Sequence, residues 1–228
     1  MRKRFLCPAL LCLALVTPSM HAFVITASPN LLPAGGSYDG PGWTFHSGLN
    51  DADFINVFIY NFSPTFAPPQ SVGLTATNSF NATIAGDYIL NGGAPTHAVV
   101  NAQGQYFIQK ISGPNGSSLG TYDTEMLLLT ISSGLPGGAL LRESPTLASD
   151  GQTTESDAGG GLFRIDSFFD IFVELSLDGG QSWIPSSGSS HQTLGNVPEP
   201  ASLSLIPAGL FCLGVFRGRA RQTRRLAP

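Results

Sequence analysis

Apolar and polar positions alternate along most of the chain in the manner of β-strands. Between residues 23 and 197, short runs rich in Phe, Ile, Val, Thr and Tyr are separated by clusters of Gly, Pro, Asn and Ser. The clusters are typical of turns, and no stretch between them has the apolar spacing of an amphipathic helix. Strands are expected at residues 23–27, 42–47, 54–62, 72–77, 80–85, 98–100, 105–111, 121–131, 140–142, 162–177 and 183–185. The close spacing of the turn signals predicts an all-β domain with an antiparallel β-sandwich or jelly-roll architecture.

Two of these strands have patterns that predict their surroundings. Residues 54–62 are apolar on both faces, which predicts a central strand. In residues 162–177 the apolar side chains alternate, which favours a long strand over a helix, although acidic residues recur every four positions. The expected inner face comprises Phe169, Ile171, Val173, Leu175 and Leu177. The expected outer face comprises Asp166, Phe168, Asp170, Phe172, Glu174 and Ser176.

The end of that long strand resembles a known hairpin motif. Residues 176–183 follow the pattern Ser-x-Asp-x-Gly-x-Ser-Trp, and the Asp-Gly pair within it favours a tight turn. The pattern is similar to the Asp-box, which implies that the Asp accepts hydrogen bonds across the turn while the Trp packs beneath it. A structural role is therefore expected for Ser176, Asp178, Gly180, Ser182 and Trp183, with ligand contact as the alternative. Because the motif occurs once, neither a propeller nor glycosidase chemistry is implied.

The N-terminus has the three parts of a secretory signal peptide. Basic residues at positions 2–4 precede an apolar run at 5–16 and a short polar stretch that contains Pro18. The apolar run is too short to span a bilayer, so residues 1–22 are expected to form a signal helix. Cleavage is expected after Ala22, with cleavage after Ser19 as the alternative. The implied partners are the Sec translocon and signal peptidase.

The C-terminus, residues 198–225, has a second tripartite pattern. A Pro-Glu-Pro motif (198–200) follows Val197 and precedes an apolar run (201–216), which is expected to form a single transmembrane helix. A basic tail (217–225) follows, and by the positive-inside rule it marks the cytoplasmic side. The residues of the motif are Val197, Pro198, Glu199 and Pro200. The residues of the basic stop are Arg217, Arg219, Arg221, Arg224 and Arg225.

This tail resembles the PEP-CTERM sorting signal of Gram-negative bacteria that produce extracellular polysaccharide. The resemblance implies that an exosortase recognises the tail and removes it near the Pro-Glu-Pro motif. It also implies export across the inner membrane, a transient membrane anchor, and release to the cell surface or extracellular matrix. Pro207 within the apolar run and the long basic tail depart from the family pattern. An ordinary single-pass anchor is the alternative.

A second resemblance lies within the segment 23–197. Residues 142–145, the glycine run 159–161, residues 165–170 and residues 176–183 look like the common core of an uncharacterised class of PEP-CTERM surface proteins. That resemblance implies secretion and no known activity.

Charge and cysteine content narrow the chemistry of the segment 23–197. It contains 3 basic and 14 acidic residues, a net charge of −11, which argues against nucleic-acid binding. It contains no cysteine, because the three cysteines lie at positions 7, 12 and 212. Disulfides and thiolate metal sites are therefore excluded from it.

Several residue groups are candidates for chemistry, each with a structural alternative. Ser118 lies in a Gly-x-Ser-x-Gly motif that lacks the following helix of a nucleophile elbow, so a hairpin loop is expected, although a triad with Asp150 and His191 can be drawn. Asp51 and Asp53 offer oxygen ligands for Ca²⁺ or form a solvated turn. The remaining candidates are the scattered His46, His97 and His191, an acidic group of Asp150, Glu155 and Asp157 in an expected mobile loop at 143–161, and the sugar-stacking or core aromatics Tyr38, Trp43, Phe168 and Trp183.

These observations favour a non-enzymatic, exported surface or matrix protein that is associated with extracellular polysaccharide. No catalytic residue and no cofactor are assigned, apart from Ca²⁺ as a candidate ligand. The alternatives are a secreted carbohydrate-active hydrolase, which would use carboxylates of the acidic strand face, and a Ca²⁺-stabilised adhesion module.

Overall fold

The fold is built from antiparallel β-strands. The structure is a computed structural model, and it describes residues 23–48 and 50–196. The strands are β1 (Val24–Thr26), β2 (Gly36–His46), β3 (Asp51–Ser63), β4 (Thr75–Leu90), β5 (Thr96–Ser112), β6 (Gly120–Ile131), β7 (Leu140–Glu143), β8 (Asp150–Gly159), β9 (Leu162–Ile171), β10 (Val173–Ser176), β11 (Ile184–Pro185) and β12 (Ser190–Asn196). One 3-10 turn, η1 (Pro136–Gly138), precedes β7. The part that the structure describes contains no helix long and apolar enough to cross a membrane. The expected signal helix, sorting motif and transmembrane helix lie outside the described residues.

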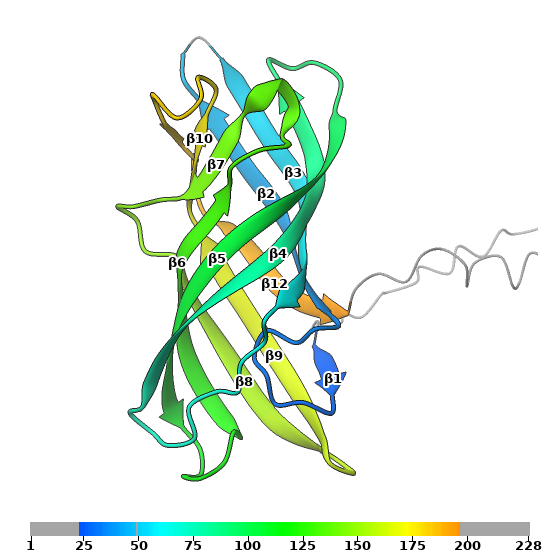
Figure 1. The fold of residues 1–228 in the computed structure, drawn as a ribbon, viewed down its shortest axis with the longest axis vertical. Coiled ribbons are helices and arrows are strands. Elements are labelled where there is room, and N and C mark those ends of the chain that lie inside the picture. Colours follow the sequence, from blue (N-terminus) through cyan, green and yellow to red (C-terminus); the bar gives the residue numbers. More distant parts are fainter. Residues whose placement is uncertain (1–22, 49, 197–228) are drawn as a thin grey trace, which may run out of the picture.

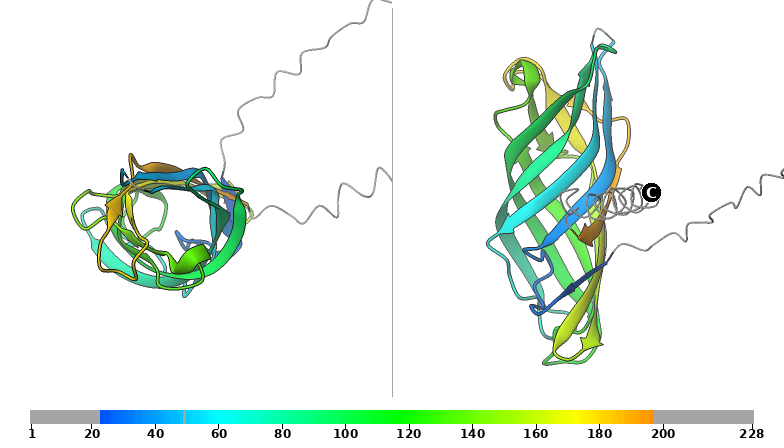
Figure 2. Two further views of the ribbon diagram at one scale, coloured as in Figure 1. Left: turned by 90° about the horizontal axis from the view of Figure 1, so that it is seen from above. Right: turned by 90° about the vertical axis from the view of Figure 1, so that its right-hand side faces the viewer.

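Eight of the strands close into a barrel. Strands β9, β12, β2, β3, β4, β5 and β6 follow one another by hydrogen bonding, and β8 pairs with both β6 and β9. Viewed from above, the strands form a ring (Figure 2). The all-β antiparallel prediction is confirmed, whereas the predicted sandwich or jelly roll is wrong. The reason is β8, which joins the two ends of one continuous sheet where a sandwich would have open edges.

Strand β8 was predicted as part of a mobile loop. Its inward-facing side chains include Thr153 and Glu155, which are 1% and 2% exposed. A strand with polar residues on its buried face has no apolar alternation, so its pattern resembles that of a loop. Strand β12 was missed for the same reason, because Ser190 and Gln192 point inward along with Leu194.

Some predicted strands are parts of longer ones. The expected strand at 72–77 begins three residues too early, and its last three residues and the expected strand at 80–85 belong to β4, while those at 98–100 and 105–111 belong to β5. In both cases the intervening residues continue the ladder. Ser79, Asn101 and Gln103 are exposed, whereas Asn78 donates a hydrogen bond to the hydroxyl of the buried Tyr106. The two strands run side by side along most of the barrel (Figure 1).

Bulges in β3 explain why its sequence is apolar on both faces. The register with β4 shifts between Ile55 and Phe58, where Asn56 has a φ of 53°. This shift exchanges the inner and outer positions, so Phe54 and Val57 both point into the barrel. The most deeply buried apolar residues therefore lie on one face of the strand, and β3 is central in the sheet as predicted, because it lies between β2 and β4.

The predicted strand at 162–177 is divided at Phe172 into β9 and β10. Its inner face is confirmed, because Phe169, Ile171, Val173 and Leu175 are all buried. Ser176 was expected outside but is fully buried, whereas Leu177 is only partly buried. Ser176 and Leu177 exchange their expected positions because β10 ends at Ser176 and the chain enters the following hairpin.

The wall of the barrel branches at its two ends. Strand β6 pairs with β8 along its first half and with β7 at its end, and β10 lies between β7 and β11. A single bridge from Phe45 to Ser186 connects this branch back to β2. At the other end, β1 pairs with the beginning of β9.

Aromatic side chains fill much of the interior. Neighbouring rings lie 5.4 to 6.0 Å apart in the order Phe169, Tyr38, Phe62, Phe80 and Tyr106. Trp43 is also buried, and its indole N–H donates a 2.7 Å hydrogen bond to the carbonyl of Ile171. Tyr38 and Trp43 are thus core residues, which confirms the structural alternative for both.

Candidate functional site

A patch of uncharged polar side chains covers the outer face of β4, β5 and β6. Asn81 of β4 is paired with Gln103 of β5, and Gln103 is paired with Thr130 of β6, so the three form one row across the strands. A neighbouring row contains Ser79 and Gln105. Because side chains alternate between the faces of a strand, these residues point outward while the residues between them point into the barrel.

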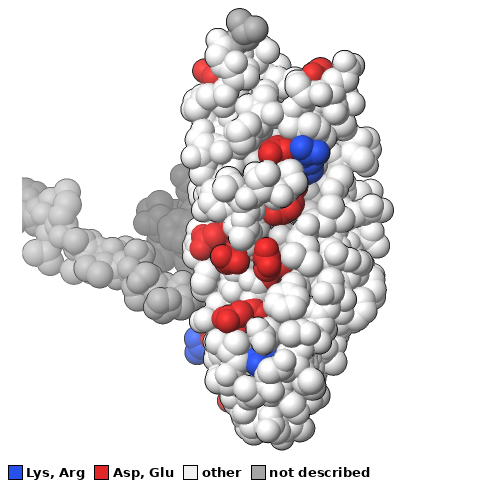
Figure 3. Space-filling model, turned by 90° about the vertical axis from the view of Figure 1, so that its left-hand side faces the viewer, with Lys and Arg blue, Asp and Glu red and all other residues white. Residues whose placement is uncertain are grey.

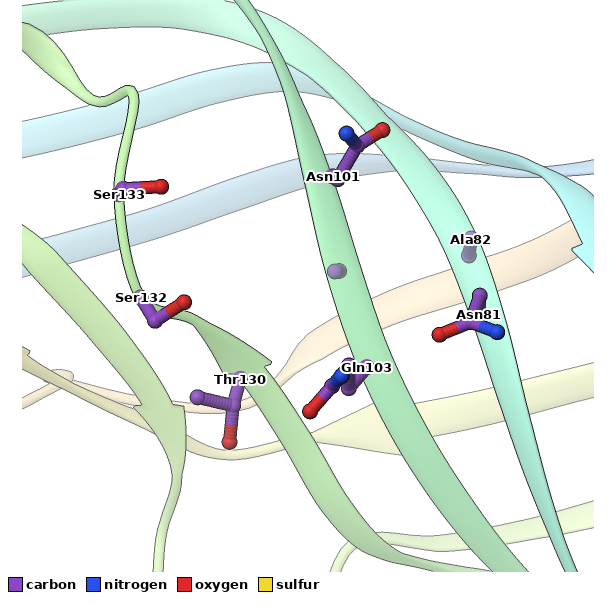
Figure 4. A pocket seen from close by; sticks show the side chains of 8 residues that line it. Asn81, Ala82, Asn101, Gln103, Thr130, Ser132 and Ser133 are labelled. Atoms are coloured by element: carbon purple, nitrogen blue, oxygen red, sulfur yellow. The ribbon is translucent and has the colours of Figure 1, made fainter.

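Two adjoining hollows lie along this patch. The first has a volume of about 320 Å³ and is lined by Asn81, Ala82, Asn101, Ala102, Gln103, Thr130, Ser132 and Ser133 (Figure 4). The second has a volume of about 300 Å³ and is lined by Ser79, Phe80, Asn81, Gln103, Gly104 and Leu128. They share Asn81 and Gln103. We call the two together the amide groove.

Local sequence features create the amide groove. Strand β6 ends at Ile131, and the chain then leaves the sheet through Ser132 and Ser133, which opens the first hollow. A bulge opposite Gln105 places one extra residue in β6, and Leu128 is exposed beside it. Bulges of this kind redirect side chains at the rims of barrels.

The amides of the groove have free hydrogen-bonding capacity. Asn81 donates from Nδ2 to the carbonyl of Ser63 over 3.4 Å, and Gln105 donates from Nε2 to Oγ of Ser79 over 3.0 Å. The exposed amides of Asn101 and Gln103 have no such partner among the described residues. A side-chain amide both donates and accepts hydrogen bonds. No charged residue lines either hollow, so the groove suits a neutral ligand rich in hydroxyl or amide groups.

Acidic side chains gather on the face of the barrel shown in Figure 3. The row of the amide groove continues into charged residues, because Thr130 is paired with Arg142 of β7 and Arg142 with Glu174 of β10. Burial raises the pKa of Glu143 to about 7, and the nearby carboxylates of Glu125 and Glu174 act in the same direction. Ser149 opposes this by donating from Oγ to Oε1 of Glu143 over 3.1 Å. Arg142 donates from Nε and Nη2 to Glu174 over 2.9 and 2.7 Å.

The hairpin after β10 is organised around the carboxylate of Asp178. Its Oδ1 accepts hydrogen bonds from Oγ of Ser176 and from the backbone N–H groups of Gln181 and Ser182, over 2.8 to 3.0 Å. Its Oδ2 accepts a hydrogen bond from Oγ of Ser182. These bonds, led by that of the Ser182 hydroxyl, lower the pKa of Asp178 to about 2. Trp183 is only half-buried, and the guanidinium of Arg142 lies 4.0 Å from its ring centroid.

Ser118 is buried in the loop between β5 and β6. Its Oγ donates to Oε1 of Glu155 over 2.6 Å. Burial raises the pKa of Glu155, while the Ser118 bond and the charge of Lys110 oppose that effect. Lys110 is fully buried, and its Nζ donates to backbone carbonyls, including that of Pro114 at 2.8 Å. This cluster joins the loop after β5 to the barrel wall.

The triad of Ser118, Asp150 and His191 is not assembled. Ser118 is buried and its hydroxyl is hydrogen-bonded to Glu155. His191 is exposed, and its Nδ1 lies 2.8 Å from Oδ1 of Asp170. Asp150 is exposed at the start of β8.

The remaining histidines and aspartates do not form a clustered site. Nδ1 of His46 lies 3.0 Å from Oδ1 of Asp51, and Nδ1 of His97 lies 3.0 Å from Oδ1 of Asp87. Asp51 and Asp53 lie in β3, not in the predicted turn. Among residues 23–48 and 50–196, no group of three or more His, Cys, Asp or Glu is arranged to hold a metal ion.

The amide groove was not predicted from the sequence. The available signal was the alternation of Asn101, Gln103 and Gln105 with small residues, which marks an outward polar face on β5. That signal was hidden because the strand was expected to be interrupted at residues 101–104. Comparison of the chain with protein-family models, curated proteins and solved structures found no match.

Proposed function

We propose that this chain is an exported surface or matrix protein that an exosortase processes and that associates with extracellular polysaccharide. The observation that carries the proposal is the amide groove, whose lining combines amides, hydroxyls and small apolar residues with no charge. Polysaccharides present many hydroxyl groups on a neutral backbone, and side-chain amides and hydroxyls bind such groups by hydrogen bonds. The Pro-Glu-Pro tail supplies the expected route to the cell surface.

The proposal assigns no catalytic residue. Ser118 and His191 are engaged with different carboxylates, in the interior and on the outer face respectively. The acids of the β9–β10 outer face have basic partners as well, since Arg164 contacts Asp166 and Arg142 contacts Glu174.

Export and processing are tested with the full chain in a bacterium that contains an exosortase. The intact mass of the extracellular protein is expected to show loss of residues 1–22 and of the basic tail. A variant with Pro198→Ala, Glu199→Ala and Pro200→Ala is expected to stay in the membrane fraction with its tail attached. A matched Ser202→Ala variant is expected to behave as the wild type. An extracellular protein that retains residues 217–228 contradicts exosortase processing.

One observation favours a second candidate, a secreted carbohydrate-active hydrolase. Glu143 has a pKa of about 7 beside other carboxylates, which suits a general acid at neutral pH. Release of shortened sugars from a polysaccharide by the wild type, abolished in Glu143→Gln, would support this candidate. Binding of the polysaccharide without any product release would exclude it for that polysaccharide.

A further inference from the structure

We infer that the amide groove binds an extended, uncharged polysaccharide chain that runs along β5, in contact with β4 and β6, and occupies at least two sugar subsites. The inference rests on the proposed function and names its ligand class and its site.

The shape of the groove indicates an oligomeric ligand. Each hollow has a volume of about 300 Å³, the lower end of the range for small-ligand pockets, and the two are continuous through Asn81 and Gln103. Successive outward residues of a strand lie about 7 Å apart, so the polar rows of β5 repeat at that interval along the groove. A single sugar would contact one hollow, whereas a chain would contact both.

The lining offers hydrogen-bonding groups for the hydroxyls at the edge of a sugar ring and an apolar surface for its C–H face. Asn101 and Gln103 offer donors and acceptors to ring hydroxyls, and Ser132 and Ser133 add hydroxyls at one end. Leu128, which is 44% exposed, offers an apolar surface at the other end. The C–H faces of a pyranose pack against such a surface, and its hydroxyls remain available for hydrogen bonds.

The charge of the groove and of its surroundings determines whether a neutral or a charged polysaccharide binds better. The groove contains no ionisable side chain, while the segment around it carries 14 acidic and 3 basic residues. An anionic polysaccharide would be repelled by this field, and a cationic one would be drawn to the acidic face instead. Arg142, the cross-strand neighbour of Thr130, is neutralised by its ion pair with Glu174, so the uncharged lining favours uncharged chains.

The test is calorimetric titration of the exported protein with neutral oligosaccharides of glucose, galactose and N-acetylglucosamine, from one to six sugars long. Oligogalacturonates of the same lengths are the charged probes. At least one neutral series is expected to bind about tenfold more tightly at three sugars than at one. The double variant Asn101→Ala, Gln103→Ala is expected to weaken that binding about tenfold or more, because each amide loses a hydrogen bond. The control Gln152→Ala, an exposed amide on β8, is expected to bind as the wild type.

The outcomes separate the inference from the proposed function. Exposed substitutions are expected to leave the unfolding midpoint unchanged, which excludes misfolding as a cause of lost binding. Binding that the double variant leaves intact, or binding confined to oligogalacturonates, overturns the inference while the association with polysaccharide stands. Binding of no oligosaccharide, together with no retention on matrix polysaccharide, overturns both.

Discussion

Ser118 and Glu155 are joined inside the barrel by a hydrogen bond of 2.6 Å between Oγ and Oε1. The bond links the loop between β5 and β6 to β8, the strand that pairs with the beginning of β6. Lys110 reinforces the link, because its buried ammonium group binds the carbonyls of Pro114 and Ser117 in the same loop. Buried polar groups thus hold this loop against β8, beside the buried ring of Tyr122, whose hydroxyl donates to the carbonyl of Ser118.

Replacing Lys110 with Met is expected to lower the free energy of unfolding by about 1 to 3 kcal/mol, because the carbonyls of Pro114 and Ser117 lose their donor. Equilibrium unfolding in urea measures the change. Gln109→Ala, at the neighbouring position of β5, is the control and is expected to change stability by less than about 0.5 kcal/mol. An equally small effect of Lys110→Met would contradict the structural role of this cluster.

Glu143 is expected to make stability fall as the pH rises. Its pKa in the folded protein is about 7, raised from an ordinary value of 4.5, so the folded state binds the proton more tightly. The contribution is complete below about pH 4.5 and is lost as the pH rises through 7. Glu143→Gln is expected to remove this decline, which solvent screening limits to about 1 kcal/mol. The free energies of unfolding of the wild type and of Glu143→Gln are measured between pH 4 and pH 8. If the two depend on pH in the same way, the pKa of Glu143 is not raised.

Asp178 has the opposite dependence on pH. Because its pKa is lowered to about 2, the carboxylate stabilises the folded state above its ordinary pKa of 3.8, and the contribution disappears as the pH falls through 2. Asp178→Ala is expected to lower the Tm at pH 7, and the two proteins are expected to converge near pH 2. Asp123→Ala, an exposed residue of β6, is the control. A Tm of Asp178→Ala equal to that of the wild type at pH 7 would show that the hairpin does not depend on this carboxylate.

Gly104 is expected to tolerate no side chain. A Cβ at this position would lie 2.2 Å from Cζ of Phe80, since the ring packs directly over the glycine. Gly104→Ala is expected to cost about 1 to 3 kcal/mol of unfolding free energy through overpacking. Gly35→Ala, where nothing lies within 4 Å of the added Cβ, is the matched control. Addition of Phe80→Leu to Gly104→Ala is expected to recover part of the loss, and its failure to do so would assign the cost to another contact.

The sequence predicts the strand-rich class and the inner face of β9 and β10, because apolar side chains alternate there without interruption. It does not predict closure of the barrel, since β8 and β12 turn Glu155 and Gln192 inward and lack that alternation. The amide groove depends on cross-strand register, which places Asn81, Gln103 and Thr130 in one row although they are far apart in sequence. Register between distant strands is a tertiary property that no local pattern encodes.

The most direct test of polysaccharide association is co-sedimentation of the exported protein with matrix polysaccharide isolated from the exporting bacterium. The wild type is expected in the pellet with the polysaccharide, and the variant Asn101→Ala, Gln103→Ala in the supernatant. Wild-type protein that remains in the supernatant at every polysaccharide concentration would contradict the proposed association.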